Sequence, residues 1–113
     1  MANKAIKRDI TIPRGDTFAF GFECAALGQD LDGAYFSCKE NADDSTYVFQ
    51  KTINDGITKV SSGKYRIRVA PEDTAELDVA DYAYDFRIEV NNDVFTIMQG
   101  AFKLTQEVTN LGE

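Results

Sequence analysis

The chain has 113 residues, of which 43% are hydrophobic and 27% charged, the size and composition of one globular domain. A formal net charge of −7 argues against a nucleic-acid partner, because such a protein needs a basic surface to displace counterions. No apolar run is long enough to span a membrane, and no apolar stretch follows the basic N-terminus, so we expect neither membrane insertion nor a signal peptide.

Turn signals rich in Gly, Pro, Asn and Asp divide the chain into short segments. In chain order, strands are expected at residues 7–12, 17–24, 34–40, 47–53, 57–60, 65–69, 81–90 and 94–104. The single expected helical turn begins at Pro71, where a proline followed by acidic residues favours a helix N-terminus.

Seven to eight short strands without strand–helix alternation predict an all-β fold, an antiparallel immunoglobulin-like β-sandwich with one short helical turn. We expect a single domain over residues 1–113, with its core at about 7–108 and a flexible tail at 109–113. By analogy with the corner tyrosine of such sandwiches, the hydroxyl of Tyr82 or Tyr84 is expected to bond back to the crossing loop.

Aromatic residues at every second position predict the core. This spacing is that of side chains on alternating faces of a strand, so one face of each such strand is apolar. The expected centre of the core is Phe18, Phe20, Phe22, Phe36, Tyr65, Ile67, Tyr84, Phe86 and Ile88.

The last predicted strand has apolar residues of both parities. Met98 and Phe102 are even, whereas Phe95 and Ile97 are odd. Either a β-bulge near Gln99–Gly100 shifts the register, or the odd face meets another surface. Gly100 would also allow another backbone to approach closely.

Cys24 and Cys38 continue two inward-facing rows, so both are expected as free thiols in the core. A disulfide between them is the alternative, although a reducing compartment does not favour it. The chain has no histidine, which excludes a Cys–His or Ser–His nucleophile. No phosphate-binding glycine loop is present either, so we expect no catalytic residue, no cofactor and no enzymatic activity.

Three acidic turns bring carboxylates close together, at Asp30–Gly33, Asn41–Asp44 and Asn91–Asp93. None has the spacing of an EF-hand loop, which ends on a glutamate. Solvated turns without a metal are therefore expected, and weak calcium binding by these loops is the alternative.

Several aromatic or apolar residues have the opposite parity from the main rows and would form an exposed patch, unless bulges return some of them to the core. The basic N-terminal segment is either a solvated leader or an electrostatic handle for an acidic partner. The predicted interface residues are Phe95, Ile97, Tyr35, Tyr47, Arg8 and Arg14. From the unpaired edges of so small a sandwich, we also expect a homo-oligomer or an obligate partner.

Five segments together resemble a known family: Gly15-Asp16-Thr17, Asp30-Leu31-Asp32-Gly33, Pro71 to Thr74, Tyr82 to Asp85, and Gly100. Over about residues 8–108 the chain is similar to the small β-sandwich domain at the N-terminus of siphophage upper baseplate proteins. That domain also occurs as short stand-alone proteins in tail gene clusters. One departure is Ala80-Asp81, where the family has a glycine.

The resemblance implies a non-enzymatic structural protein of a phage or prophage virion, a tail or baseplate adaptor acting through protein–protein interfaces. Its partners would be other virion or tail proteins and further copies of the chain. It would be made in the host cytoplasm and then reside in the virion. The alternative function is a carbohydrate- or cell-surface-binding β-sandwich module that uses Tyr35 and Tyr47 as stacking platforms.

Overall fold

The computed structural model describes residues 5–23 and 30–109, and within them the fold is all-β with one short helix. Its strands are β1 (Ile6–Lys7), β2 (Ile10–Pro13), β3 (Phe18–Glu23), β4 (Gly33–Lys39), β5 (Phe49–Ile53), β6 (Gly56–Ser61), β7 (Lys64–Val69), β8 (Asp81–Val90) and β9 (Asp93–Thr105). The helix α1 (Pro71–Thr74) lies where the proline predicted it. No helix in the described ranges is long and apolar enough to cross a membrane.

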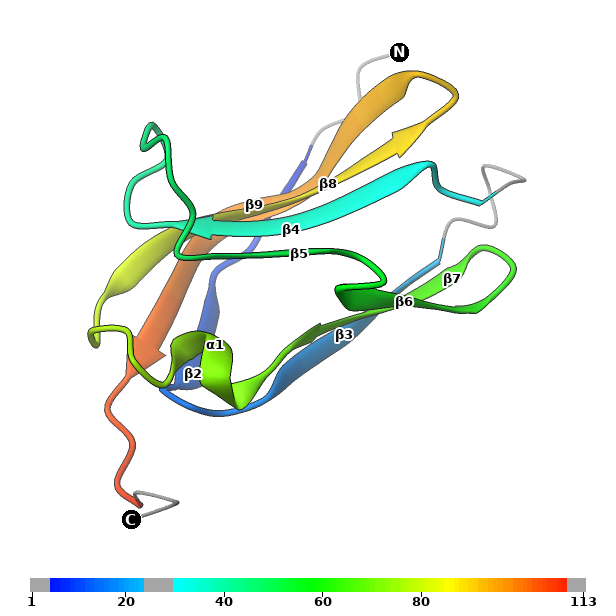
Figure 1. Ribbon diagram of the computed structural model, residues 1–113. Coiled ribbons are helices and arrows are strands. Elements are labelled where there is room, and N and C mark those ends of the chain that lie inside the picture. The colour runs from blue at the N-terminus through cyan, green and yellow to red at the C-terminus, as the bar shows by residue number, and fades with distance from the viewer. Residues whose placement is uncertain (1–4, 24–29, 110–113) are drawn as a thin grey trace.

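The strands form one continuous, curled sheet in the order β1-β9-β8-β4-β5-β6-β7-β3, with β2 also paired to β9. The curl sets β4, β8 and β9 in one layer against β3, β6 and β7 in the other (Figure 1). One layer passes into the other at the β5–β6 junction, which has only two residue pairs. There the chain turns through Asn54 and Gly56, whose φ angles of 69° and 95° lie in the left-handed region.

The sheet is mixed, which corrects the expectation of antiparallel strands throughout. β1 and β2 run parallel to β9, and β5 runs parallel to β6, whereas the other pairings are antiparallel. Alternation in the sequence shows which residues share a face but not which strands become neighbours, so this direction was not predictable from the pattern.

Aromatic rings from both layers fill the core. Phe36 and Phe86 are fully buried in one layer, and Phe20 of the opposite layer contacts both, with ring centroids 5.7 Å apart in each case. Phe102 lies in the same cluster, 5.6 Å from Phe49 and 6.2 Å from Phe18. The edge-on geometry of most of these pairs is the one that aromatic quadrupoles prefer.

Most of the predicted core is confirmed, and the β3 row is a partial correction. Phe18, Phe20 and Phe22 pack against the core but are only partly buried. The reason is that β3 is the last strand in the sheet order, so its side chains have neighbours on one side only. Phe102, absent from the expected centre, is fully buried.

A β-bulge in β9 resolves the conflict of parity in the last strand. Phe86 pairs with Met98 and Arg87 with Thr96, so Ile97 is the extra residue. The bulge therefore lies two residues before the position expected near Gln99–Gly100. Before the bulge, the odd-numbered residues of β9 face inward, and after it the even-numbered residues do. Phe95 therefore lies opposite the buried Ile88.

The N-terminal segment runs alongside β9 and comes closest to it at Gly100, where the absence of a side chain suggested a close approach of another backbone. A Cβ atom on Gly100 would lie 2.5 Å from the backbone oxygen of Arg8. That oxygen also accepts a hydrogen bond from the Tyr84 hydroxyl, and Asp9 accepts one from the backbone N–H of Ala101. The backbone that approaches Gly100 is therefore this chain's own.

Two side chains hold the segment between β7 and β8, residues 70–80, which also leads from one layer to the other. Asp73 accepts a hydrogen bond from the backbone N–H of Ala70 at 2.7 Å and forms an ion pair with Lys51 at 2.7 Å. The hydroxyl of Tyr82 donates to the backbone oxygen of Asp78 at 2.7 Å, four residues upstream. This is the expected corner tyrosine.

Cys38 lies in the core as a free thiol, and burial raises its pKa to about 12. The prediction for this cysteine is confirmed. The free thiol of Cys38 argues against the alternative disulfide, whereas Cys24 lies outside the described residues and its inward position stays a prediction.

Phe102→Ala should lower the free energy of unfolding by about 3–5 kcal/mol, because it removes a fully buried ring and leaves a cavity. The matched control is Phe22→Ala on the edge strand, where a partly buried ring is lost and the drop should be smaller. Urea unfolding followed by circular dichroism measures both. Equal losses would contradict the assignment of Phe102 to the centre of the core.

Gly100→Ala should destabilise the fold by about 1–3 kcal/mol and loosen the N-terminal segment, because its Cβ clashes with the Arg8 backbone. Gly21→Ala is the control, since its Cβ would meet only the Tyr65 oxygen at an ordinary 3.8 Å. Hydrogen exchange at the Arg8 N–H, which bonds to the Gln99 oxygen at 2.9 Å, reports the loosening. Unchanged protection in Gly100→Ala would show that the crossing does not depend on this glycine.

Candidate functional site

The outer face of β4 and β8 carries polar side chains. Side chains alternate along each strand, and the apolar ones face the core. Phe36 and Phe86 pair on the inner side, so the flanking residues point outward. In register, Ser37 lies opposite Asp85, and Tyr35 opposite Arg87. These two cross-strand pairs form the middle of the outer face.

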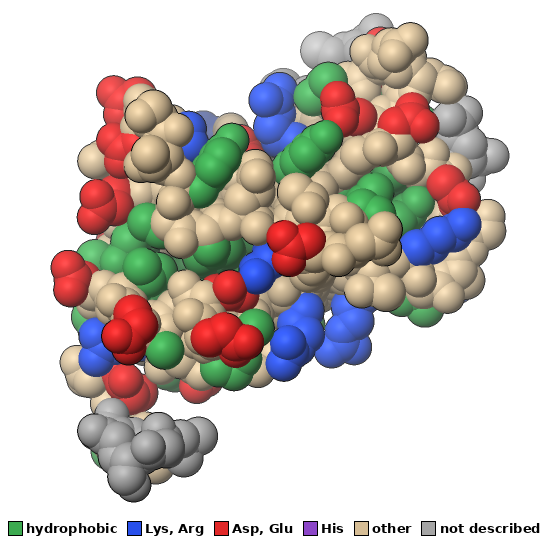
Figure 2. All heavy atoms as spheres, in the orientation of Figure 1, with side chains coloured by type: hydrophobic (Ala, Val, Ile, Leu, Met, Phe, Trp, Pro, Cys, Tyr) green, Lys and Arg blue, Asp and Glu red, His purple; other side chains and the backbone are tan. Residues whose placement is uncertain are grey.

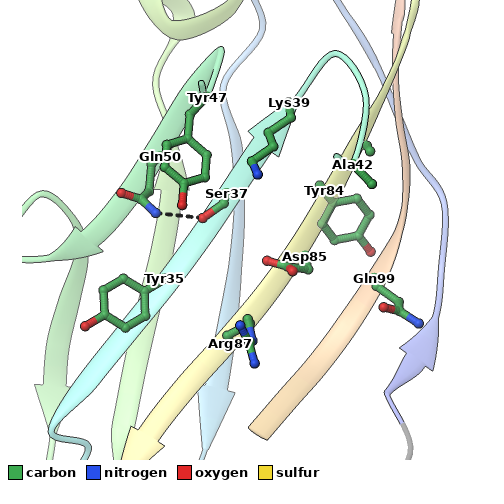
Figure 3. A pocket seen from close by; sticks show the side chains of 11 residues that line it. Tyr35, Ser37, Lys39, Ala42, Tyr47, Gln50, Tyr84, Asp85, Arg87 and Gln99 are labelled. Carbon is green, nitrogen blue, oxygen red and sulfur yellow. Dashed lines mark hydrogen bonds between the residues drawn. The ribbon is translucent and has the colours of Figure 1, made fainter. Parts of the chain in front are cut away.

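This face is hollowed into a cavity of about 420 Å³, called here the concave face. Its polar and aromatic side chains come from β4, β5, β8, β9 and the loop before β5 (Figure 3). They are Tyr35, Ser37, Lys39, Tyr47, Gln50, Tyr84, Asp85, Arg87 and Gln99. The volume is within the range of small-molecule sites, at the low end.

Tyr47 stands at the rim of the concave face with 49% of its surface exposed. The Lys39 ammonium lies 5.1 Å from the centre of the ring and donates a hydrogen bond to the Asp44 backbone oxygen at 2.7 Å. Asp44 in turn accepts a hydrogen bond from the backbone N–H of Asn41. The hydrogen bonds order the loop before β5, and the ammonium contact favours this orientation of the exposed Tyr47 ring.

Tyr35 forms a second aromatic wall and is half-buried. Its hydroxyl donates a hydrogen bond to the Glu89 carboxylate at 2.6 Å. This hydrogen bond, followed by burial, raises the pKa of Tyr35, so the phenol keeps its proton at neutral pH.

The floor combines two polar side chains that bond to each other with a carboxylate that still reaches solvent. The Gln50 amide donates to the Ser37 hydroxyl at 2.9 Å. The side-chain carboxylate of Asp85, beside it, makes no hydrogen bond over residues 5–23 and 30–109. Burial raises the pKa of Asp85, although the nearby charges of Arg87 and Lys39 oppose that shift. A half-buried carboxylate without a hydrogen bond weakens the fold and leaves an acceptor free for a ligand.

The predicted interface residues do not form one patch. Tyr35 and Tyr47 line the concave face together. Phe95 and Ile97 instead pack partly buried against the core, as the bulge alternative predicted. An outer-face role for this pair is therefore not supported by their position.

The two predicted basic residues are apart from the concave face. Arg14 is held within the molecule, because its guanidinium pairs with Glu107 at 3.2 Å and donates to the Leu77 backbone oxygen at 3.1 Å. Arg8 is exposed, but its backbone lies along β9 of the same chain, so the leader does not extend away at this point.

The acidic turns use their carboxylates for local hydrogen bonds. Asp30 pairs with Lys59 and accepts from the Gly63 N–H, which lowers the pKa of Asp30. Asp32 accepts from the Asn91 N–H at 2.9 Å. No three acidic or cysteine side chains converge on a common point in the described part of the chain. Calcium binding by these loops stays an untested alternative.

A second exposed surface was not predicted. The alternation of β7 buries Tyr65, Ile67 and Val69 and turns three basic residues outward, called here the basic row. They are Lys64, Arg66 and Arg68. None of the three forms a salt bridge within the ranges 5–23 and 30–109. The basic row could have been predicted from the sequence, because the three residues lie at every second position along the strand.

Asp85, Arg87, Gln50 and Gln99 were also missed. The outward parity was readable for the strand that carries Asp85 and Arg87 but not for those of Gln50 and Gln99, and only the pairing of β5, β4, β8 and β9 brings the four onto one surface. Compared with known proteins, the chain matches no protein-family model and has no significant match among curated proteins.

Asp85→Asn should raise the melting temperature at pH 7. Because burial raises the folded-state pKa of Asp85 above its ordinary 3.8, its ionised form disfavours folding, and this penalty disappears as the pH falls toward 3.8. The gain of the variant should shrink over that interval. Asp81→Asn, an exposed carboxylate on the same strand, is the control. A lower melting temperature for Asp85→Asn at pH 7 would show that its charge is stabilised in the fold.

Proposed function

We propose that the protein is a non-enzymatic structural component of a phage or prophage particle, a tail or baseplate adaptor that works through protein–protein interfaces. One support is the resemblance of residues 8–108 to the small domain of upper baseplate proteins. A second is a surface on which charges of opposite sign are separated, as an assembling subunit requires.

The proposal includes the finer fold assignment, an immunoglobulin-like sandwich. Two facing layers with an aromatic core, and a corner tyrosine at Tyr82, support it. The parallel addition of β1 and β2 to β9 would then be a variation on that plan.

The observation that carries the adaptor function is the basic row on a protein of net charge −7. Residues at every second position of a strand stand about 6.8 Å apart, so the row presents three regularly spaced cations. Beside Arg66 and Arg68, the neighbouring strand β3 has only Gly21 and Ala19 in register. Such small neighbours leave both guanidinium groups accessible to a partner.

Acidic side chains gather around α1, beyond the end of β7 that carries Arg68. Glu72, Glu76, Asp78 and Asp81 are exposed around α1. Figure 2 shows acidic groups at the end that carries α1 in Figure 1, and basic groups projecting beneath the layer of β3, β6 and β7. A second copy that places its acidic end on the basic row would form a head-to-tail contact, which closes into a ring when the rotation allows.

The triple variant Lys64→Glu/Arg66→Glu/Arg68→Glu should abolish self-association, because it sets like charges against each other. Size-exclusion chromatography with light scattering at low and high salt measures this, and the wild-type oligomer should weaken as salt rises. Combining the triple variant with a Glu72→Lys/Glu76→Lys/Asp78→Lys chain should restore a mixed oligomer. A wild type that stays monomeric at high micromolar concentration would end the self-assembly form and leave only a partner protein.

The place in the particle is tested directly by mass spectrometry of purified virions from the lysogen or phage that carries this sequence. We expect the chain among the virion proteins at a ratio fitting a tail ring. Abundance in lysates without recovery in particles would refute the structural role, whatever the oligomeric state of the isolated protein.

A further inference from the structure

We propose that the concave face is a binding site for an uncharged pyranose sugar, with Tyr47 and Tyr35 as its aromatic walls and Asp85 as its central acceptor. This goes beyond the adaptor function and does not depend on it, because the concave face and the basic row lie on different layers of the sheet.

The aromatic contribution comes from an exposed ring. Tyr47 is 49% exposed at the rim, the Lys39 ammonium lies 5.1 Å from the centre of its ring, and the hydrogen bond of Lys39 to Asp44 orders the loop that carries the ring. The C–H face of a pyranose packs on such a ring by burying apolar area. A ring whose orientation is already favoured loses less conformational entropy when a ligand binds.

The polar groups match hydroxyls, which both donate and accept hydrogen bonds. The Asp85 carboxylate has only acceptor atoms and no hydrogen bond within the described ranges, so it suits a hydroxyl donor. Arg87 and Gln99 flank it, the first on the same strand and the second opposite it in register on β9. All three side chains line the cavity (Figure 3), so a sugar bound there would meet an acceptor in Asp85 and donors in Arg87 and Gln99.

The other ligand classes fit less well. The cavity is lined by two positive charges, Lys39 and Arg87, which both act on the carboxylate of Asp85, and a phosphate or carboxylate would meet that negative charge as well. An extended peptide would have to add to a strand edge, but β4 and β8 are both paired on their two sides. The volume of about 420 Å³ holds one or two sugar rings.

The test is a glycan array with the wild-type chain, followed by isothermal titration of the best pyranoside it identifies. Saturable binding to one class of neutral sugar is expected. Tyr47→Ala should weaken it about tenfold through the lost aromatic contact. Asp85→Asn should weaken it about tenfold or more, because a charged acceptor becomes a neutral amide.

Two variants control for nonspecific effects. Val60→Ala removes an exposed apolar side chain from another surface, and Asp81→Asn neutralises a carboxylate of β8 that does not line the cavity. Both should bind as the wild type does, and so should the Lys64→Glu/Arg66→Glu/Arg68→Glu chain, which separates this site from assembly. No saturable binding on the array, or wild-type affinity in both Tyr47→Ala and Asp85→Asn, would overturn the proposal. Loss of binding when calcium is chelated would overturn the proposal too, because it would show that the sugar is bound through calcium at the acidic turns.

Discussion

The register between β4 and β8 is the constraint on which the rest of the structure depends. Phe36 pairs with Phe86 on the inner side, and both are fully buried. With that pair in place, the neighbouring Ser37 and Asp85 must face outward. A slip of one residue would put a carboxylate into the aromatic core and phenylalanines into water, so the core and the concave face are two sides of one register.

The same alternation in the opposite layer produces the second surface. Phe20 contacts the rings of both Phe36 and Phe86, which sets the two layers against each other. Its partner strand β7 buries Ile67 and turns Arg66 and Arg68 outward. The molecule therefore has a basic row on one layer and a hollow with aromatic walls on the other. Under the two proposals, the basic row would serve assembly and the concave face would bind a ligand, so the two surfaces would be separate.

Local irregularities adapt the sheet to these demands. The bulge at Ile97 lets β9 bury Phe95 at one end and Phe102 at the other. Gly100 leaves room for the N-terminal segment, which covers the edge of β9 that would otherwise be exposed. Asp85 is the exception to this pattern of satisfied contacts, since burial disfavours its charge and no hydrogen bond within the described residues offsets it. A cost of that kind is typical of binding sites.

The sequence by itself determined the class of fold, most strand positions, the inner row from Phe36 to Cys38 and the corner at Tyr82, because alternation and turn chemistry are local properties. It also identified Tyr35 and Tyr47 as residues off the main apolar rows. Only the tertiary structure decided that β1 and β2 run parallel to β9, that the bulge falls at Ile97 and that Phe95 turns inward. It alone brought Gln50, Asp85 and Gln99 onto one concave face. Each of these depends on which distant strands become neighbours, and the period of a single strand carries no information about its neighbours.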